Sequence, residues 1–143
     1  MYQSVVVGTD GSDTAAAAVR HAFGLALVTG ASVHVVTAWS RVPALVLSSA
    51  SVVGPQVATD DGEWVRQLHE GIREQAAQFG VQATTHAVED TPAKALLDVA
   101  RQQNADLLIV GNRGMTGLRG KLGSVPNTVA HKAHCAVLVV PTT

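Results

Sequence analysis

The stretch ADLLIVGNRGMTGLRGKLGSV, residues 105–125, joins a short apolar run to a loop with a glycine at every third position. Glycine loses more conformational freedom on folding than any other residue, so five glycines in thirteen residues (111–123) must be offset by something that the folded loop gains. Collagen has the same period, but it needs many repeats and abundant proline, and the nearest proline, Pro126, follows the repeats. The rest of the chain has to indicate which structural role these glycines have.

The composition is that of one compact domain. The chain has 143 residues, 47% hydrophobic and 15% charged, and residues 1–143 are expected to fold as a single domain. A net charge of −1 argues against a nucleic-acid partner or an acidic membrane surface. No apolar run has the length of a membrane span, and the amino terminus lacks a secretory pattern. With Cys135 as the only cysteine, no internal disulfide forms, and we expect a cytoplasmic protein.

Short β-branched runs alternate with helical patterns along the chain. The predicted strands span residues 4–9, 32–39, 81–88, 105–111 and 136–141. Three of them are almost continuously apolar, as expected of parallel strands that are covered on both faces. A helix between each pair of strands gives a single-domain α/β fold, an open twisted parallel sheet with helices on both faces. Residues 40–60 show no clear period and are interpreted as a long connection.

The helices are predicted from apolar spacing and from capping residues. Ser12 is expected to cap the first helix. The second carries an apolar stripe with Trp64 and Phe79, which we expect in the core, and its Glu/Arg residues form a solvated face. Thr91, with a proline directly after it, is typical of a helix start. Ser124 is expected to cap the last helix, which reaches about residue 134.

Two unusual turns follow strands that can share one crevice. GTDGSD (8–13) follows the first strand, and the five-glycine loop follows the fourth. Doubly wound sheets bind ligands where the strand order reverses, and an order of 3-2-1-4-5 puts that point between strands one and four. Uncovered glycine amides and the helix start at Ser124 favour an anion, and Arg113, Arg119 and Lys121 add cations. A phosphate group is the predicted ligand.

Two widespread phosphate-binding motifs do not match. A Walker A loop ends in Gly-Lys-Ser/Thr, whereas Gly120-Lys121 is followed by Leu122. The dinucleotide fingerprint G-x-G-x-x-G should follow the first strand, where GTDGSD stands instead. The P-loop hydrolase and Rossmann dehydrogenase interpretations are therefore disfavoured.

GNRGMTGLRGKLGSV, followed by an alanine-rich helix and AVLVVP, resembles the nucleotide-binding carboxyl terminus of the universal stress protein family. VVVGTDGSDTAAAAV is similar to the first strand and turn of that family, and the resemblance covers essentially the whole chain. It implies the five-stranded 3-2-1-4-5 sheet of an adenine-nucleotide alpha-hydrolase-like fold. It also implies an adenine nucleotide (ATP, AMP or cyclic AMP) in the crevice and a homodimer joined along residues 136–140.

The resemblance assigns roles by position. Asp10 would contact ribose hydroxyls or a Mg²⁺ bridging to the phosphates, because a carboxylate would repel a phosphate directly. The backbone of Ala38 would bind the adenine edge. The other implied contacts with ribose and phosphates are Gly8, Thr9, Gly111, Asn112, Arg113, Gly114, Met115, Gly123, Ser124 and Val125. The family usually has nine residues between its second and third glycines, whereas Gly114 to Gly123 leaves eight, which makes AMP or cyclic AMP credible beside ATP.

Three functions remain open at this point. A nucleotide-binding regulatory protein of the stress response is favoured. A weak ATP hydrolase ranks lower, because the sequence offers no evident general base or Walker lysine and so no catalytic residue. The third is a nucleotide-free dimerisation module, since residues 136–140 would form an apolar edge strand.

The histidines and the cysteine add no motif. His131, His134 and Cys135 lie close together in the sequence, but cations at a helix end explain the two histidines better than a metal site does. The remaining histidines are scattered: His21, His34, His69 and His86.

Overall fold

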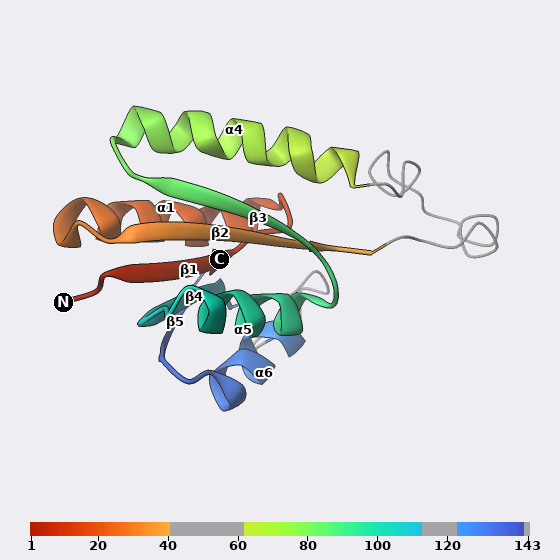
Figure 1. The fold of residues 1–143 in the computed structure, drawn as a ribbon. Helices are drawn as coiled ribbons and strands as arrows, with labels where there is room; N and C mark the ends of the chain where they lie inside the picture. Colours follow the sequence, from red (N-terminus) through yellow and green to blue (C-terminus); the bar gives the residue numbers. More distant parts are fainter. Residues whose placement is uncertain (41–61, 113–122, 142–143) are drawn as a thin grey trace.

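The computed structural model describes residues 1–40, 62–112 and 123–141, and it forms one sheet with helices on both faces (Figure 1). The strands are β1 (Ser4–Gly8), β2 (Ser32–Trp39), β3 (Ala83–Glu89), β4 (Leu107–Gly111) and β5 (Ala136–Val140). The helices are α1 (Asp13–Thr29), α4 (Glu63–Phe79), α5 (Pro92–Gln102) and α6 (Ser124–Lys132). The predicted alternation of strands and helices is confirmed.

The sheet is parallel throughout and has the order β3-β2-β1-β4-β5. The central strand β1 pairs with β2 on one side and β4 on the other, so Val7 lies between Val35 and Ile109. The predicted order is therefore confirmed, and with it the reversal between β1 and β4. Both neighbours of β1 run in its direction, which brings all three carboxyl ends to one edge of the sheet.

Alternate residues of β1 face two separate cores. Val5 and Val7 pack beneath α1 and α4 with Phe23, whereas Val6 packs with Leu96 and Leu108 on the side of α5 and α6. This division explains the continuous apolar run of β1, because both faces of a strand with helices above and below must exclude water. Figure 1 shows α1 and α4 on one side of the sheet and α5 and α6 on the other.

The buried face of α4 differs from the predicted one. Val65, His69, Ile72 and Ala76 are buried, whereas Trp64 is only half-buried and Phe79 is 38% exposed. The prediction that Phe79 lies in the core is wrong. Apolar spacing alone does not fix the rotation of α4 about its own axis to better than about one residue. In the fold the helix is rotated so that His69 faces the sheet. The Phe79 ring instead lies against Phe23 at the end of the helix, with ring centroids 5.7 Å apart.

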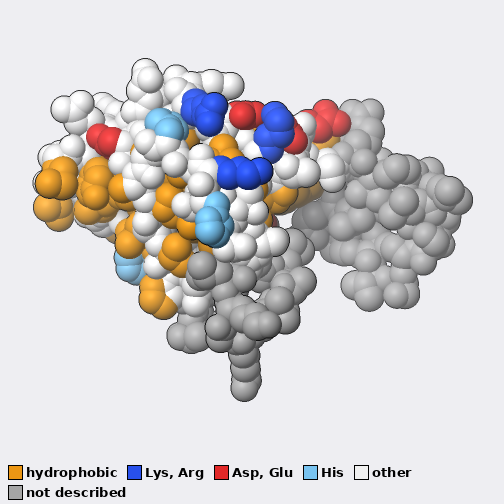
Figure 2. All heavy atoms as spheres, turned by 90° about the horizontal axis from the view of Figure 1, so that it is seen from below, with side chains coloured by type: hydrophobic (Ala, Val, Ile, Leu, Met, Phe, Trp, Pro, Cys, Tyr) orange, Lys and Arg blue, Asp and Glu red, His pale blue; other side chains and the backbone are white. Residues whose placement is uncertain are grey.

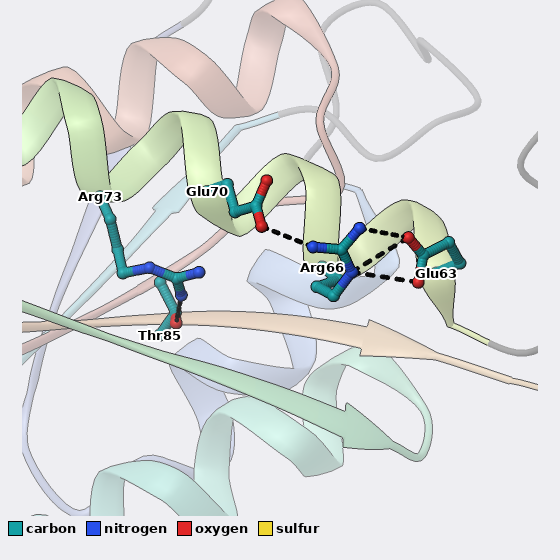
Figure 3. A network of polar contacts seen from close by, with 5 residues as sticks. All are labelled: Glu63, Arg66, Glu70, Arg73 and Thr85. Atoms are coloured by element: carbon teal, nitrogen blue, oxygen red, sulfur yellow. Dashed lines mark hydrogen bonds and ion pairs between the residues drawn. The ribbon is translucent and has the colours of Figure 1, made fainter.

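The outer face of α4 carries a charged network (Figure 3). Arg66 forms ion pairs with Glu63 and Glu70, one turn away in each direction. All three are exposed, so these ion pairs contribute little to stability. Arg73 reaches from the same helix to the sheet, where its Nη1 donates a hydrogen bond of 2.7 Å to Thr85 Oγ1 on the edge strand β3.

The opposite side of the molecule, viewed from below α5 and α6, mixes charges of both signs (Figure 2). Lys94 on α5 pairs with Asp90 and Asp98, so its charge is locally balanced. Among the described residues, no helix combines the length and the apolar character needed to cross a membrane.

The capping predictions hold for α1 and fail for α6. Ser12 is the N-cap of α1, and its Oγ accepts a hydrogen bond of 3.2 Å from the amide of Ala15. Thr91 occupies the N-cap of α5, although its side chain makes no capping bond. The N-cap of α6 is Gly123, with extended backbone angles, and Ser124 is the first helical residue. The prediction that Ser124 caps this helix is wrong, and α6 ends at Lys132.

A buried polar contact joins α4 to β2. His69 Nε2 lies 2.8 Å from Thr37 Oγ1, with 4% of His69 and none of Thr37 exposed. Burial, together with the charges of Arg73 and His86, lowers the pKa of His69 from 6.5 to about 4. The imidazole is therefore neutral in the fold at pH values where the same side chain becomes protonated in the unfolded chain.

We expect this histidine to make the fold acid-sensitive. Its pKa is lower in the folded state, so its contribution to stability is complete above pH 6.5 and is lost as the pH falls toward about 4. The free energy of unfolding from urea titrations should decrease by on the order of 1 kcal/mol for each pH unit in this window. His69→Gln should flatten the slope, and His21→Gln, on the exposed side of α1, should leave it unchanged. Identical slopes for wild type and His69→Gln would contradict the assignment.

Candidate functional site

The carboxyl ends of β1 and β4 lie at the same edge of the sheet. Val7 pairs with Ile109, and the two strands end at Gly8 and Gly111. The amide of Thr9 donates a hydrogen bond of 2.9 Å to the carbonyl of Val36, which ties the chain beyond β1 to β2. The two turns singled out in the sequence therefore begin side by side.

Two backbone hydrogen bonds bring the start of α6 to the end of β4. The amide of Asn112 donates to the carbonyl of Val140 at 2.9 Å, and the amide of Gly123 donates to the carbonyl of Asn112 at 3.2 Å. Gly111, Asn112 and Gly123 are thus together, and Ser124 and Val125 follow directly. The contacts predicted at Arg113, Gly114 and Met115 lie outside the described residues, as do Arg119 and Lys121.

The amino end of α6 offers backbone amides that can bind an anion. No side chain among the described residues caps it, and the first four amides of a helix have no acceptor within the helix. Pro126 has no amide hydrogen, which leaves Ser124 and Val125 as the first donors. The positive end of the helix dipole adds to their attraction for an anion.

The turn after β1 is held by its own side chains. The amide of Gly11, whose φ is 86°, donates to Thr9 Oγ1 at 3.1 Å, and the amide of Ser12 donates to Asp10 Oδ1 at 2.9 Å. Asp10 is exposed, and this bond involves only one of its two carboxylate oxygens. The turn therefore presents a carboxylate at the sheet edge, where it can accept hydrogen bonds from hydroxyls or bind a hard cation.

Ala38 lies on β2 just beyond the end of β1. The last pair between β1 and β2 is Gly8 with Val36, and the carbonyl of Val36 points toward β1. Backbone direction repeats every two residues along a strand, so the amide and carbonyl of Ala38 point the same way. They face the space beyond β1, where a planar ring with donor and acceptor edges can form hydrogen bonds.

Gly8 also has a packing reason to be glycine. A Cβ at this position would lie 2.9 Å from Cδ2 and 3.1 Å from Cδ1 of Leu96, which is 4% exposed in α5. The close approach seats α5 against the end of β1 and so helps to position the turn that carries Asp10.

A cavity of about 310 Å³ opens between α1 and α4 beside this turn. Thr9, Gly11 and Ser12 line it together with apolar residues of the two helices, including Leu68 and Ile72. Thr9 is the only described member of the predicted contact set that lines it, and α6 lies on the opposite face of the sheet. The cavity is thus separate from the predicted phosphate position, and the sequence analysis did not find it.

The residues around the end of α6 form no metal cluster. Nowhere in residues 1–40, 62–112 or 123–141 do three His, Cys, Asp or Glu side chains gather in a way that could hold an ion. Cys135 is half-buried against the core beneath α5, and burial raises the pKa of its thiol, with the nearby charge of Asp106 adding to the effect. A thiol held in its protonated form is a poor metal ligand.

The comparison with known proteins agrees with this geometry. The family model described as "Universal stress protein family" matches residues 1–141. The chain belongs to the universal stress protein family. It is 32% identical over 144 residues to universal stress protein MJ0531 of Methanocaldococcus jannaschii, covering 98% of this chain and 82% of that protein. It is 34% identical over 147 residues to universal stress protein Rv1636 of Mycobacterium tuberculosis, covering 99% and 98%.

Solved structures of the family share the fold. A universal stress protein crystallised in complex with cAMP is 31% identical to this chain, with a TM-score of 0.77. The match covers 99% of this chain and 98% of that protein. The universal stress protein of Archaeoglobus fulgidus in complex with dAMP has a TM-score of 0.69, covers 96% and 97%, and is 20% identical. At that identity the second structure supports the fold alone.

We expect Gly8→Ala to destabilise this universal stress protein by about 1 kcal/mol, because the new methyl would crowd Leu96. In a Leu96→Ala background the same change should cost almost nothing, and a double-mutant cycle from denaturant unfolding would measure the difference. Gly24→Ala is the matched control. A Cβ there meets nothing within 4 Å, so alanine should stabilise helix α1 by about 0.5–1 kcal/mol. An equal cost for Gly8→Ala in both backgrounds would contradict the packing role.

Proposed function

We propose that this universal stress protein binds an adenine nucleotide at the edge formed by β1, β2 and β4, and that it acts as a regulatory protein of the stress response. The observation that carries the proposal is the hydrogen bond from the amide of Gly123 to the carbonyl of Asn112. It joins the amino end of α6 to the end of β4, next to the turn after β1. The similar protein crystallised with cAMP supports the same ligand class.

The amides of Ser124 and Val125, with the Ser124 hydroxyl, would bind the phosphate. Charge-assisted hydrogen bonds from a helix start suit an oxyanion and need no lysine at this point. Gly123 lets the backbone approach closely, while its own amide stays bonded to Asn112. Arg113, Gly114 and Met115 would complete the phosphate and ribose contacts from the rest of the loop.

The turn after β1 and the end of β2 would bind the nucleoside. The exposed Asp10 carboxylate would accept hydrogen bonds from ribose hydroxyls, with Gly8 and Thr9 beside it. With a triphosphate, Asp10 could instead supply the one carboxylate that Mg²⁺ needs alongside phosphate oxygens and water, and the ion would neutralise phosphate charge. The Ala38 amide and carbonyl would bind the adenine edge.

The spacing of the loop glycines bears on how many phosphates the bound nucleotide carries. The spacing of eight residues from Gly114 to Gly123 is one shorter than the usual family pattern. We propose that AMP and cyclic AMP bind at least as well as ATP, since the phosphate donors that the structure describes are concentrated at the start of α6. The single cysteine of the chain also fits a reducing cytoplasm, where we place the protein.

Calorimetric titration with ATP, AMP and cyclic AMP tests the proposal. Ser124→Pro should weaken binding by at least tenfold, because it removes both the amide hydrogen and the hydroxyl. Proline is favoured at the first helical position, and Gly123 already has the extended φ and ψ that precede a proline, so the helix should persist. Ser124→Ala removes the hydroxyl alone and should have a smaller effect.

Ser12→Ala is the matched control for this titration. It removes the N-cap bond of α1 and should cost about 1 kcal/mol of stability, with little change in nucleotide affinity. Heat signals absent for all three nucleotides would reject the proposed function and leave the dimerisation module as the better interpretation.

We also propose a homodimer formed along Ala136–Val140. β5 ends the sheet order, is apolar, and leaves Leu138 38% exposed. An unpaired apolar edge favours pairing with a second copy of the same strand.

Light scattering during size-exclusion chromatography should give the mass of a dimer. Leu138→Lys should shift the protein toward monomer, because a charge would be buried at the joined edge. Val28→Lys, at a position 85% exposed near the end of α1, should leave the dimer intact. A wild-type monomer at all concentrations would exclude this interface.

A further inference from the structure

Two histidines from neighbouring strands face each other on the side of the sheet covered by α5. His34 Nδ1 on β2 lies 3.0 Å from His86 Nε2 on β3, with ring centroids 5.2 Å apart and ring planes inclined by 42°. The register pairs His34 with Val6 and His86 with Val36, two valines of the core beneath α5, so both imidazoles share that face. Each ring is half-buried and retains a path to solvent.

Both imidazoles are in the chemical form that binds metals. Burial lowers the pKa of both side chains, and the charge of His86 lowers that of His34 further. At pH 7 and above both rings are therefore neutral, and a neutral imidazole has a nitrogen lone pair that it can donate to an ion. In the absence of metal the pair can share one proton in a hydrogen bond.

The separation of the two nitrogens fits one ion between them. Metal–nitrogen bonds of about 2.0–2.1 Å to atoms 3.0 Å apart subtend roughly 91–97° at the metal. This is close to the angle of about 90° between adjacent ligands in square-planar and octahedral coordination, which Cu²⁺ and Ni²⁺ adopt with nitrogen and oxygen ligands. The tetrahedral angle of about 109° that Zn²⁺ prefers would need the nitrogens slightly further apart.

We propose that His34 and His86 form a two-imidazole binding site for a borderline transition-metal ion of the Ni²⁺ or Cu²⁺ class, with water completing the coordination. The described residues offer no third His, Cys, Asp or Glu ligand, so the site is open and the ion exchangeable. A bound ion would join the edge strand β3 to β2. His34 lies near the amino end of β2, and His86 pairs with Val36, two residues before the proposed nucleotide contact at Ala38.

The full-length, tag-free protein should be stripped of metal and titrated with Ni²⁺ at pH 7.5. One ion should bind per chain, and His34→Gln and His86→Gln should each weaken binding by at least tenfold. Ni²⁺ should raise the Tm of the wild type and leave that of either variant unchanged. Mg²⁺, which prefers oxygen ligands, should have no effect on the pair. The matched control is His131→Gln/His134→Gln, which removes two exposed histidines at the end of α6 and should leave Ni²⁺ binding intact.

A second measurement identifies the ligating side chains without any substitution. Addition of substoichiometric paramagnetic Cu²⁺ should broaden the imidazole resonances of His34 and His86 together, before those of the other histidines. The proposal is overturned if Ni²⁺ does not bind, if binding survives in both single variants, or if the Cu²⁺ broadening appears first at His131 and His134 instead. Any of these results would leave the pair as a hydrogen bond between two imidazoles.

Discussion

The structure depends on the complete burial of β1. Val5, Val6 and Val7 have no exposed surface, because helices cover both faces of the sheet and β2 and β4 pair with both edges of the strand. A strand enclosed in this way can meet a ligand only where it ends. The amino end of β1 is held by Asp106, whose carboxylate accepts hydrogen bonds from the amides of Gln3 and Ser4. The carboxyl end opens into the turn that carries Asp10, and this asymmetry places the candidate site.

Three glycines near the carboxyl ends of β1 and β4 have different structural roles. Gly8 is small because Leu96 of α5 packs against the end of β1, and Gly11 adopts a left-handed φ that reverses the chain into α1. Gly123 caps α6 from an extended conformation and bonds to Asn112 at the end of β4. Ser124 is therefore the first helical residue and not the N-cap, and no side chain in the described part of the chain caps this helix. In the proposed function the Ser124 hydroxyl becomes a phosphate ligand.

The histidines show how residues without a sequence motif acquire distinct environments. His69 is buried against Thr37 with its pKa lowered to about 4, so the fold favours the neutral imidazole at the contact between α4 and β2. His34 and His86, 52 positions apart, meet because β2 and β3 are neighbours and both side chains project to the α5 face. The first pair stabilises the fold in a pH-dependent way. The second pair carries the proposed metal site.

The amino-acid sequence by itself determined the succession of strands and helices, the capping of α1 by Ser12 and the strands whose ends flank the candidate site. These features follow from local patterns, because apolar periodicity and capping chemistry act over a few residues. The strand order came from the resemblance to the family. The tertiary structure alone decided which side of α4 faces the core, leaving Phe79 exposed and His69 buried. It also decided that Gly123 rather than Ser124 caps α6 and that His34 meets His86. Helix rotation, backbone contacts at a helix start and cross-strand neighbours all depend on residues far away in the chain, and no local period encodes them.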